Sequence, residues 1–409
     1  MLNHIWAGLI LLALLSAGVQ AGFMGDAQVL ERMTQALIEC GKLGFELALG
    51  LTGMLCLWLG LLAIAEAAGL VALLSKTLRP LFTHLFPQVP QDHPAMGSMS
   101  LNIAANMLGL DNAATPLGLK AMAQLQSLNP HPERATAAQT LFLVINTASV
   151  TLLPVSVLTY RAQLGAAHPA DVFLPLLLTS LSATLIGVIA AGFCLRLQLR
   201  HPVVLAFGLG LLGLIAAVSL TMHGASAEAM QQYSQYFSQS LLLFTVVLFL
   251  LAGLIKKVPV YEVFITGAKE GFATAVQLIP YLVAMFLAIS LLRASGSLDL
   301  ILQVVKSGVT FLGFDTRWVD ALPTMILKSL SGSGARASML DVMRVHGADS
   351  FAGRLVSIIQ GSSETTFYVL TVYFGSVGIR RCGVALGCAL VADVAAAVLG
   401  VVYCYGFFG

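Results

Sequence analysis

Charged residues are scarce in this sequence. Asp, Glu, Lys and Arg make up 10% of its 409 residues, while 58% are hydrophobic; an ordinary soluble protein carries about 25% charged residues. The mean hydropathy is +0.90. So few charges cannot cover the surface of this chain in water, so much of that surface must face lipid. The net charge of +2 also lacks the positive excess that nucleic-acid binding requires, and we expect no nucleic-acid partner.

Metal-binding and redox motifs are missing as well. The six cysteines show no CxxC spacing, and most lie inside apolar runs, where cysteine behaves as a small hydrophobic residue. We therefore expect no metal site and no cofactor. The first apolar run ends in small residues around Ala21, as a signal peptide does, but only His4 stands where a basic segment should precede it. We expect this run to be a retained membrane span.

Long apolar runs recur along the whole chain. A spanning helix needs about 20 mostly apolar residues. The runs that qualify are 3–22, 47–73, 137–158, 172–195, 202–222, 239–255, 272–292, 355–376 and 383–405. They predict an all-α polytopic membrane protein with about nine transmembrane helices.

Two parts of the sequence resemble each other without gaps in two blocks. In the first block, 42–48 aligns with 269–275, including a lysine, a glycine and a phenylalanine in register. In the second block, 145–149 aligns with 359–363. We infer that residues 26–161 and 253–376 are duplicated. Five predicted spans separate the two repeat starts; an odd number inverts one repeat against the other, and inverted repeats place substrate sites near the membrane midplane.

Polar residues first interrupt the apolar pattern at 98–120. Asn102 and Asn106 lie one helical turn apart on one face, and Asp111 and Pro116 then break the pattern. A helix, a break and a second helix predict a re-entrant hairpin, which survives at membrane depth only when it is buried in protein or faces water. An ordinary loop outside the membrane is the alternative.

The second repeat has its own polar stretch at 322–337. Ser331 and Ser333 alternate there with glycines, next to Lys328. Such a segment offers N–H groups and hydroxyls to an anion or a hydroxyl group. A Ser–Lys hydrolase is the enzymatic alternative, but no oxyanion site accompanies it, so we do not expect an enzyme. The sequence therefore predicts two re-entrant helical hairpins.

A second pair of polar clusters lies inside the apolar runs 137–158 and 355–376. In the second run, Gln360, Ser363 and Glu364 fall on one helical face. An intramembrane acid costs about 2.5–3.5 kcal/mol on insertion scales and indicates a functional site. For the serines and threonines, hydrogen bonding between helices is the simpler interpretation.

The remaining charges leave alternatives open. Glu66 and Arg293 occupy equivalent repeat positions, and either pair with each other or extend separately toward the membrane interface. Asp393, alone in its span, is either a site residue or a structural partner. The predicted solute-binding residues are Asn102, Asn106, Asp111, Asn112, Thr115, Asn146, Thr147, Ser149, Ser331, Ser333, Gln360, Ser362, Ser363, Glu364 and Thr365, with Lys328, Glu66 and Arg293 as coupling or ion-pair residues.

The polar motifs resemble a known family. Residues 102–110, 112–120 and 145–147 look like spore maturation protein A, and residues 330–334 and 360–368 look like spore maturation protein B. The resemblance covers nearly the whole chain as a fusion of the two. It implies the nucleoside-recognition, or Gate, domain that is shared with concentrative nucleoside transporters and with the membrane part of ferrous iron transporter B, and hence two inverted Gate-type repeats.

With this resemblance the chain divides into a first half at 1–196 (repeat core 26–161), a connecting helix and loop at 197–238, and a second half at 239–409 (repeat core 253–376). We expect a membrane transporter or channel that binds a small polar solute near the midplane between the repeats. The alternative is a non-transporting membrane scaffold or partner of cell-envelope machinery, with buried polar clusters and no wet cavity. The resemblance further implies a multi-pass protein of the bacterial inner membrane, in contact with the lipid bilayer and assembled as a homo-oligomer.

Overall fold

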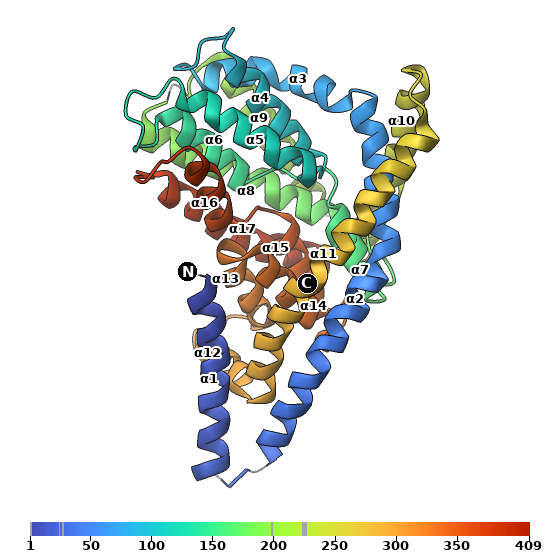
Figure 1. Cartoon of the computed structure of the whole chain (residues 1–409), viewed down its shortest axis with the longest axis vertical. Coiled ribbons are helices and arrows are strands. Elements are labelled where there is room, and N and C mark those ends of the chain that lie inside the picture. The colour runs from blue at the N-terminus through green and yellow to red at the C-terminus, as the bar shows by residue number, and fades with distance from the viewer. Residues whose placement is uncertain (1, 24, 27, 198, 223–226) are drawn as a thin grey trace.

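The chain folds into a long, tapering assembly of helices (Figure 1). The computed structural model describes residues 2–23, 25–26, 28–197, 199–222 and 227–409. Residues 198 and 223–226, in the predicted connecting segment, and the side chains of Asp111 and Asn112 lie outside the described residues. Within the described part, the backbone forms helices and loops, with one isolated bridge between Arg134 and Arg381.

The two halves contain similar series of helices. The first is α1 (Leu2–Phe23), α2 (Gln28–Ala67), α3 (Leu70–Leu85), α4 (Pro94–Met107), α5 (Asp111–Gln126), α6 (Ala137–Thr147), α7 (Val155–Gln163) and α8 (Phe173–Leu195), followed by α9 (Pro202–Met222). The second is α10 (Ala227–Ile255), α11 (Val260–Ala294), α12 (Ser297–Phe311), the short 3₁₀ helix η1 (Val319–Ala321), α13 (Leu322–Leu330), α14 (Gly332–His346), α15 (Phe351–Gly361), α16 (Thr366–Ser376) and α17 (Ala385–Phe408).

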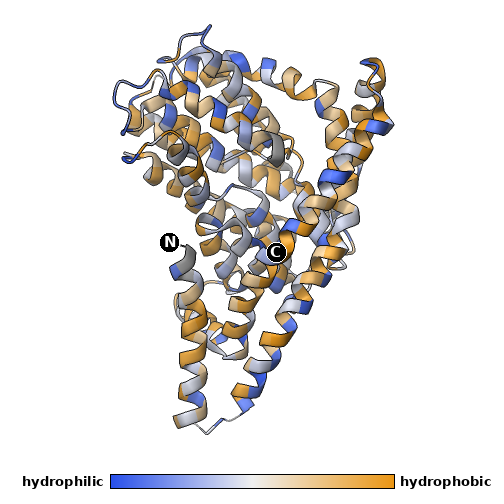
Figure 2. Ribbon diagram, in the orientation of Figure 1, coloured by the Kyte–Doolittle hydropathy of each residue, from blue (hydrophilic) through white to orange (hydrophobic). Residues whose placement is uncertain are grey.

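The helix lengths confirm a polytopic membrane protein. Among the described residues, α1, α2, α8, α10, α11 and α17 contain segments that are long and apolar enough to cross a membrane, six in all. Hydrophobic residues follow α2 and α11 over most of their length (Figure 2). Many of these apolar side chains are exposed, among them Leu49 on α2 and Tyr281 on α11. Extended apolar surface of this kind fits contact with lipid rather than with water.

Three of the predicted spans differ in form from the expectation. The run 47–73 lies mostly in the longer helix α2. This helix ends at Ala67, because Gly69 adopts a left-handed conformation with φ of 79°. The runs 137–158 and 355–376 are not continuous helices: 148–154 separates α6 from α7, and 362–365 separates α15 from α16. In the first break Pro154 has no N–H to continue a helix.

The repeat is visible in matched helix boundaries. The register that aligns 42–48 with 269–275 also aligns Gly69, before α3, with Gly296, before α12, and both have positive φ, 79° and 69°. Glycine adopts this conformation at little cost. In the register that aligns 145–149 with 359–363, both ends of α6 match both ends of α15.

The long helices α2 and α11 cross in opposite directions, which makes the repeats inverted (Figure 1). Gly44 lies against Val283, while Gly271 lies against the backbone of Cys56. The early part of each helix thus meets the later part of the other. In the repeat alignment Gly44 is equivalent to Gly271, and Cys56 is equivalent to Val283, so the two contacts are copies of each other. The crossing therefore has approximate two-fold symmetry, as inverted repeats require.

Both predicted hairpins are present. Helices α4 and α5 are tied by a hydrogen bond from Asn102 Nδ2 to the Ala114 carbonyl at 2.8 Å. Helices α13 and α14 are tied by the hydroxyls of Thr324 and Ser338 at 2.9 Å. The first hairpin turns at Gly109, with φ of 73°, and the second turns at the extended residue Ser331.

A buried ion network joins the first half to the second. The Arg161 side chain on α7 is fully buried, and its guanidinium lies 2.8 Å from Asp171 and 3.0 Å from Asp349. Arg354 on α15 reaches the other oxygen of Asp171 at 2.9 Å. Because Asp171 belongs to the first half and Asp349 to the second, the network holds the two halves of the chain together.

Candidate functional site

Four breaks in the helices meet around a small polar cavity. The cavity has a volume of about 110 Å³ and is lined by residues from both hairpin turns and both broken helices. The predicted residues on its wall are Asn106, Lys328, Gln360, Ser363, Glu364 and Thr365. Side chains that are distant in sequence converge here because the turn of each hairpin and the break of each interrupted helix border the same cavity.

Backbone hydrogen bonds hold the breaks together. The Glu364 amide donates to the Thr147 carbonyl at 2.8 Å, which joins the break of α15–α16 to the end of α6. The Leu152 amide donates to the Met107 carbonyl at 2.8 Å, which joins the other break to the first hairpin. Unwound backbone that is buried needs such partners, because its N–H and C=O groups have lost the bonds of a helix.

The two repeats use related side-chain bonds next to the cavity. In the first half, Asn106 Nδ2 donates to Asn146 Oδ1 at 2.9 Å. In the second, Lys328 Nζ donates to the carbonyl of Gln360 at 2.7 Å. In each case a residue near the end of a hairpin helix reaches the last turn of a broken helix. Asn146 and Gln360 are themselves equivalent positions in the alignment of 145–149 with 359–363.

Glu364 lies on the cavity wall and is exposed. Among the described residues, its carboxylate makes no hydrogen bond or ion pair, although its backbone is fixed by Thr147. Thr365 lies beside the second hairpin, since a Cβ on Gly332 would stand 2.8 Å from its hydroxyl. The backbone of Glu364 is thus fixed while its carboxylate has no protein partner in the described part of the chain, so the carboxylate can accept a hydrogen bond from a solute.

Other predicted residues lie behind the cavity and bond to the protein itself. Asn102 is fully buried and donates to the Tyr373 hydroxyl at 3.2 Å, and this hydroxyl donates to Asn146 at 3.3 Å. Thr147 and Ser362 each donate to a carbonyl one turn back, and Ser331 caps α14 by accepting from Gly334. Ser149, Thr115 and Ser333 are also absent from the cavity wall. The bonds of Thr147, Ser362 and Ser331 lie within one helix or cap its end, so they differ from the predicted hydrogen bonds between helices.

Removing the buried hydroxyl of Tyr373 gives a direct test of this internal network. We expect Tyr373→Phe to lower the free energy of unfolding by about 1–3 kcal/mol, because it leaves polar groups of Asn102 and Asn146 buried with fewer partners. Thermal unfolding in detergent measures the loss. Tyr368→Phe is the matched control because Tyr368 is exposed on the same helix. Equal melting temperatures for the two variants would contradict a structural role for the hydroxyl.

Glu66 and Arg293 do not pair with each other. The Arg293 guanidinium instead binds Asp341 on α14 at 2.5 Å, with Asp299 at 3.6 Å. Glu66 is exposed near the end of α2 and forms no ion pair within the described part of the chain. The pseudo-symmetric pairing across the repeat axis is therefore wrong, because the second hairpin brings a carboxylate closer to Arg293 than the distant end of α2 does.

Asp393 has a specific partner. It is buried on α17, and its Oδ2 accepts a hydrogen bond from Thr366 Oγ1 at 2.8 Å. Its other oxygen, Oδ1, has no hydrogen-bond partner among the described residues. Ser329 and Lys328 of α13 also interact with this carboxylate. Asp393 thus anchors the start of α16, directly after the break that lines the cavity.

Arg336 and Tyr160 line the cavity but were not among the predicted site residues. Arg336 lies within the polar stretch 322–337. The rule that marks an intramembrane charge as functional, which singled out Glu364, applies equally to this arginine. Tyr160 carries no comparable signal, because a tyrosine near a span end is usually an interfacial anchor.

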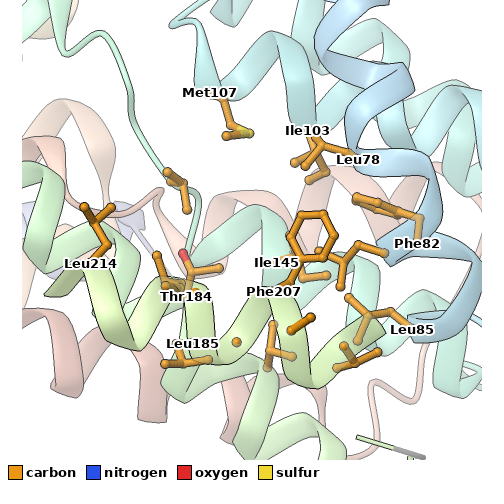
Figure 3. A pocket seen from close by; sticks show the side chains of 18 residues that line it. Leu78, Phe82, Leu85, Ile103, Met107, Ile145, Thr184, Leu185, Phe207 and Leu214 are labelled. Carbon is orange, nitrogen blue, oxygen red and sulfur yellow. The ribbon is translucent and has the colours of Figure 1, made fainter. Parts of the chain in front are cut away.

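A larger cavity, of about 620 Å³, lies elsewhere between α3, α4, α6, α8 and α9. Leucines, phenylalanines and other apolar residues line it, as Figure 3 shows, and its polar side chain Thr184 already donates to the Ala148 and Ser180 carbonyls. The larger volume therefore does not make this cavity the better candidate for binding a polar solute. The small cavity between the repeats offers the directed polar contacts that recognition of a polar solute needs.

Comparison with known proteins gives consistent matches. Residues 48–164 and 275–380 match the family model Gate, described as nucleoside recognition. Spore maturation protein B of Bacillus subtilis (strain 168) is 44% identical over 160 residues, which is 39% of this chain and 88% of that protein. Spore maturation protein A of the same organism is 38% identical over 191 residues, 47% of this chain and 92% of that protein. No solved structure matches the chain.

Proposed function

Since the chain belongs to the Gate nucleoside-recognition family of membrane proteins, we propose that it is a transporter or channel for a small polar solute, which it binds between its two inverted repeats. The observation that supports this proposal is the polar cavity at which both hairpins and both broken helices meet. Inverted-repeat transporters hold their substrates at interrupted helices of this kind.

The proposed solute contacts are Asn106, Gln360, Ser363 and Glu364, which face the cavity from both halves. Glu364 accepts a donor group of the solute, and it is also suited to carry a coupling proton or cation. Each half, 1–196 and 239–409, supplies one hairpin and one broken helix, and 197–238 connects them. In this proposal the protein works in the inner membrane of a bacterium as a homo-oligomer.

A scaffold without transport requires the polar clusters to be consumed by internal bonds. Several of them are, as the network of Asn102, Asn146 and Tyr373 illustrates. The carboxylate of Glu364 and the cavity beside it are not explained in this way. We therefore favour transport over a scaffold.

The proposal is tested with the purified full chain in proteoliposomes. Uptake of labelled nucleosides, amino acids and carboxylates is measured for the wild type, for Glu364→Gln and for Glu262→Gln, which removes an exposed carboxylate in the first turn of α11. We expect uptake of at least one probe, reduced about tenfold or more in Glu364→Gln, because a hydrogen bond to a charged group contributes about 1.5–3 kcal/mol. Glu262→Gln should transport normally.

A second measurement separates a dry scaffold from a transporter with an untested substrate. In a background whose native cysteines are replaced, Ser363→Cys should react with a small membrane-impermeant thiol reagent, because Ser363 faces the cavity. The matched control is Ser357→Cys, since Ser357 is fully buried on the preceding helix. If Ser363→Cys does not react with the thiol reagent and no probe is taken up, transport through this cavity is excluded.

A further inference from the structure

Arg336 brings a positive charge to the wall of the cavity. It lies about one turn after the start of α14, the second helix of the second hairpin, and it is part of the cavity wall. Its guanidinium carbon stands 5.7 Å from the centre of the Tyr160 ring. Among the described residues, it forms no ion pair, and its buried Nε has no hydrogen-bond partner.

The ring of Tyr160 orients this guanidinium but does not neutralise it. A cation–π contact contributes about 0.5–2 kcal/mol, whereas a partly buried charge without a counter-ion costs several kcal/mol in a medium of low dielectric. A planar guanidinium with free N–H groups matches the two oxygens of a carboxylate. A negatively charged ligand group is the partner that removes the cost.

The other charges and helix ends around Arg336 largely offset one another. Lys328 is also on the cavity wall, but its Nζ donates to the Gln360 carbonyl and its charge interacts with the Asp393 carboxylate. The first residues of α7 and α14, Val155 and Gly332, line the same space, but so do Asn106 and Gly361 at the ends of α4 and α15, so the helix dipoles there oppose one another. Glu364 adds one carboxylate to the wall, so the preference for an anion comes from the guanidinium of Arg336 itself.

From these contacts we infer that the solute is a small carboxylic acid that also carries an amino or hydroxyl donor, with its carboxylate on Arg336 and its donor on Glu364. The inference rests on the proposed transport function and names its substrate class. An uncharged nucleoside would leave the guanidinium without a counter-ion. The volume of about 110 Å³ is small compared with the roughly 300–1,000 Å³ of usual ligand pockets, which agrees with a small acid.

Binding to the purified full chain in detergent tests the inference. The probes are L-serine, L-lactate and glycine as small acids and uridine as an uncharged nucleoside, and the readout is the concentration-dependent shift in melting temperature. We expect at least one acid to stabilise the wild type and uridine to have no effect. Arg336→Gln should weaken acid binding about tenfold or more, because a charge-assisted bidentate contact is lost.

Two further variants keep the result interpretable. Arg344→Gln removes an exposed arginine from the same helix and should bind acids as the wild type does. Arg336→Lys keeps the charge but loses the planar fork, so it should bind with intermediate affinity if the first variant fails to fold. Wild-type affinity in Arg336→Gln, or the absence of binding by all three acids, overturns the inference.

The outcomes also distinguish this inference from the proposed function. If uridine is bound and taken up while the acids are not, the chain is a transporter with another substrate class. If no probe is taken up and Ser363→Cys does not react with the thiol reagent, transport itself is excluded. If acids bind and Arg336→Gln loses that binding, the assignment of Arg336 holds whether or not flux is detected.

Discussion

Replacing Arg161 by alanine is expected to lower the free energy of unfolding by about 3–5 kcal/mol, the loss that follows when one partner of a buried ion pair is removed. The guanidinium is fully buried and contacts both Asp171 and Asp349. It also donates to the Pro169 and Ala348 carbonyls at 3.0 and 2.7 Å. Without it, Asp171, which is fully buried, retains Arg354 as its ion-pair partner.

The loss is measured as a fall in the melting temperature of the purified protein in detergent. Arg380→Ala is the matched control, because the pair of Arg380 with Glu133 is long, at 3.7 Å, and both side chains are largely exposed. A surface pair of this kind contributes only about 0–1 kcal/mol. If the two arginine variants melt at the same temperature, the buried network does not hold the halves together.

The second large effect is expected at the crossing of α2 and α11. A Cβ on Gly271 would lie 2.6 Å from the Leu55 carbonyl oxygen and 2.7 Å from the Cys56 backbone. Backbone atoms of a packed helix cannot move aside as a flexible side chain can, so Gly271→Ala forces the helices apart. We expect a loss of about 1–3 kcal/mol, and more for Gly271→Val, which adds further volume.

The approximate symmetry of the crossing supplies an internal comparison. At Gly44, the position equivalent to Gly271, a Cβ would first meet a Val283 methyl at 2.7 Å, with that residue's backbone nitrogen at 3.0 Å. Gly44→Ala should therefore destabilise less than Gly271→Ala. Gly308→Ala on α12 is the neutral control, because no atom lies within 4 Å of its added Cβ. Melting temperatures in the order Gly308→Ala, Gly44→Ala, Gly271→Ala, from highest to lowest, are the expected result, and a reversed order of the last two contradicts the close backbone contact.

The candidate site divides into a wall and a support. Asn106 and Glu364 face the cavity, while the Asn102 side chain ties the first hairpin and the Thr147 carbonyl accepts from the Glu364 amide behind it. All four are polar residues in apolar segments, so the sequence cannot separate the two roles. The separation depends on which way each side chain points once the helices have packed.

The sequence by itself determined the membrane environment, the all-helical class, the duplication and the two hairpins. These follow from local properties: the length of apolar runs, the break at Gly109 and Asp111, and residues in register such as Gly44 with Gly271. Each such property acts within one helix or one turn. It is therefore readable without knowing what lies opposite.

Only the tertiary structure decided the partners. It bonded Arg293 to Asp341 rather than to Glu66, enclosed Arg161 in an ion network between the halves, and set Arg336 on the cavity wall. Residues distant in the sequence form these contacts because the repeats pack in opposite directions about the α2–α11 crossing. The choice among several nearby charges then depends on distances of a few ångströms, and the order of residues along the chain contains no such distances.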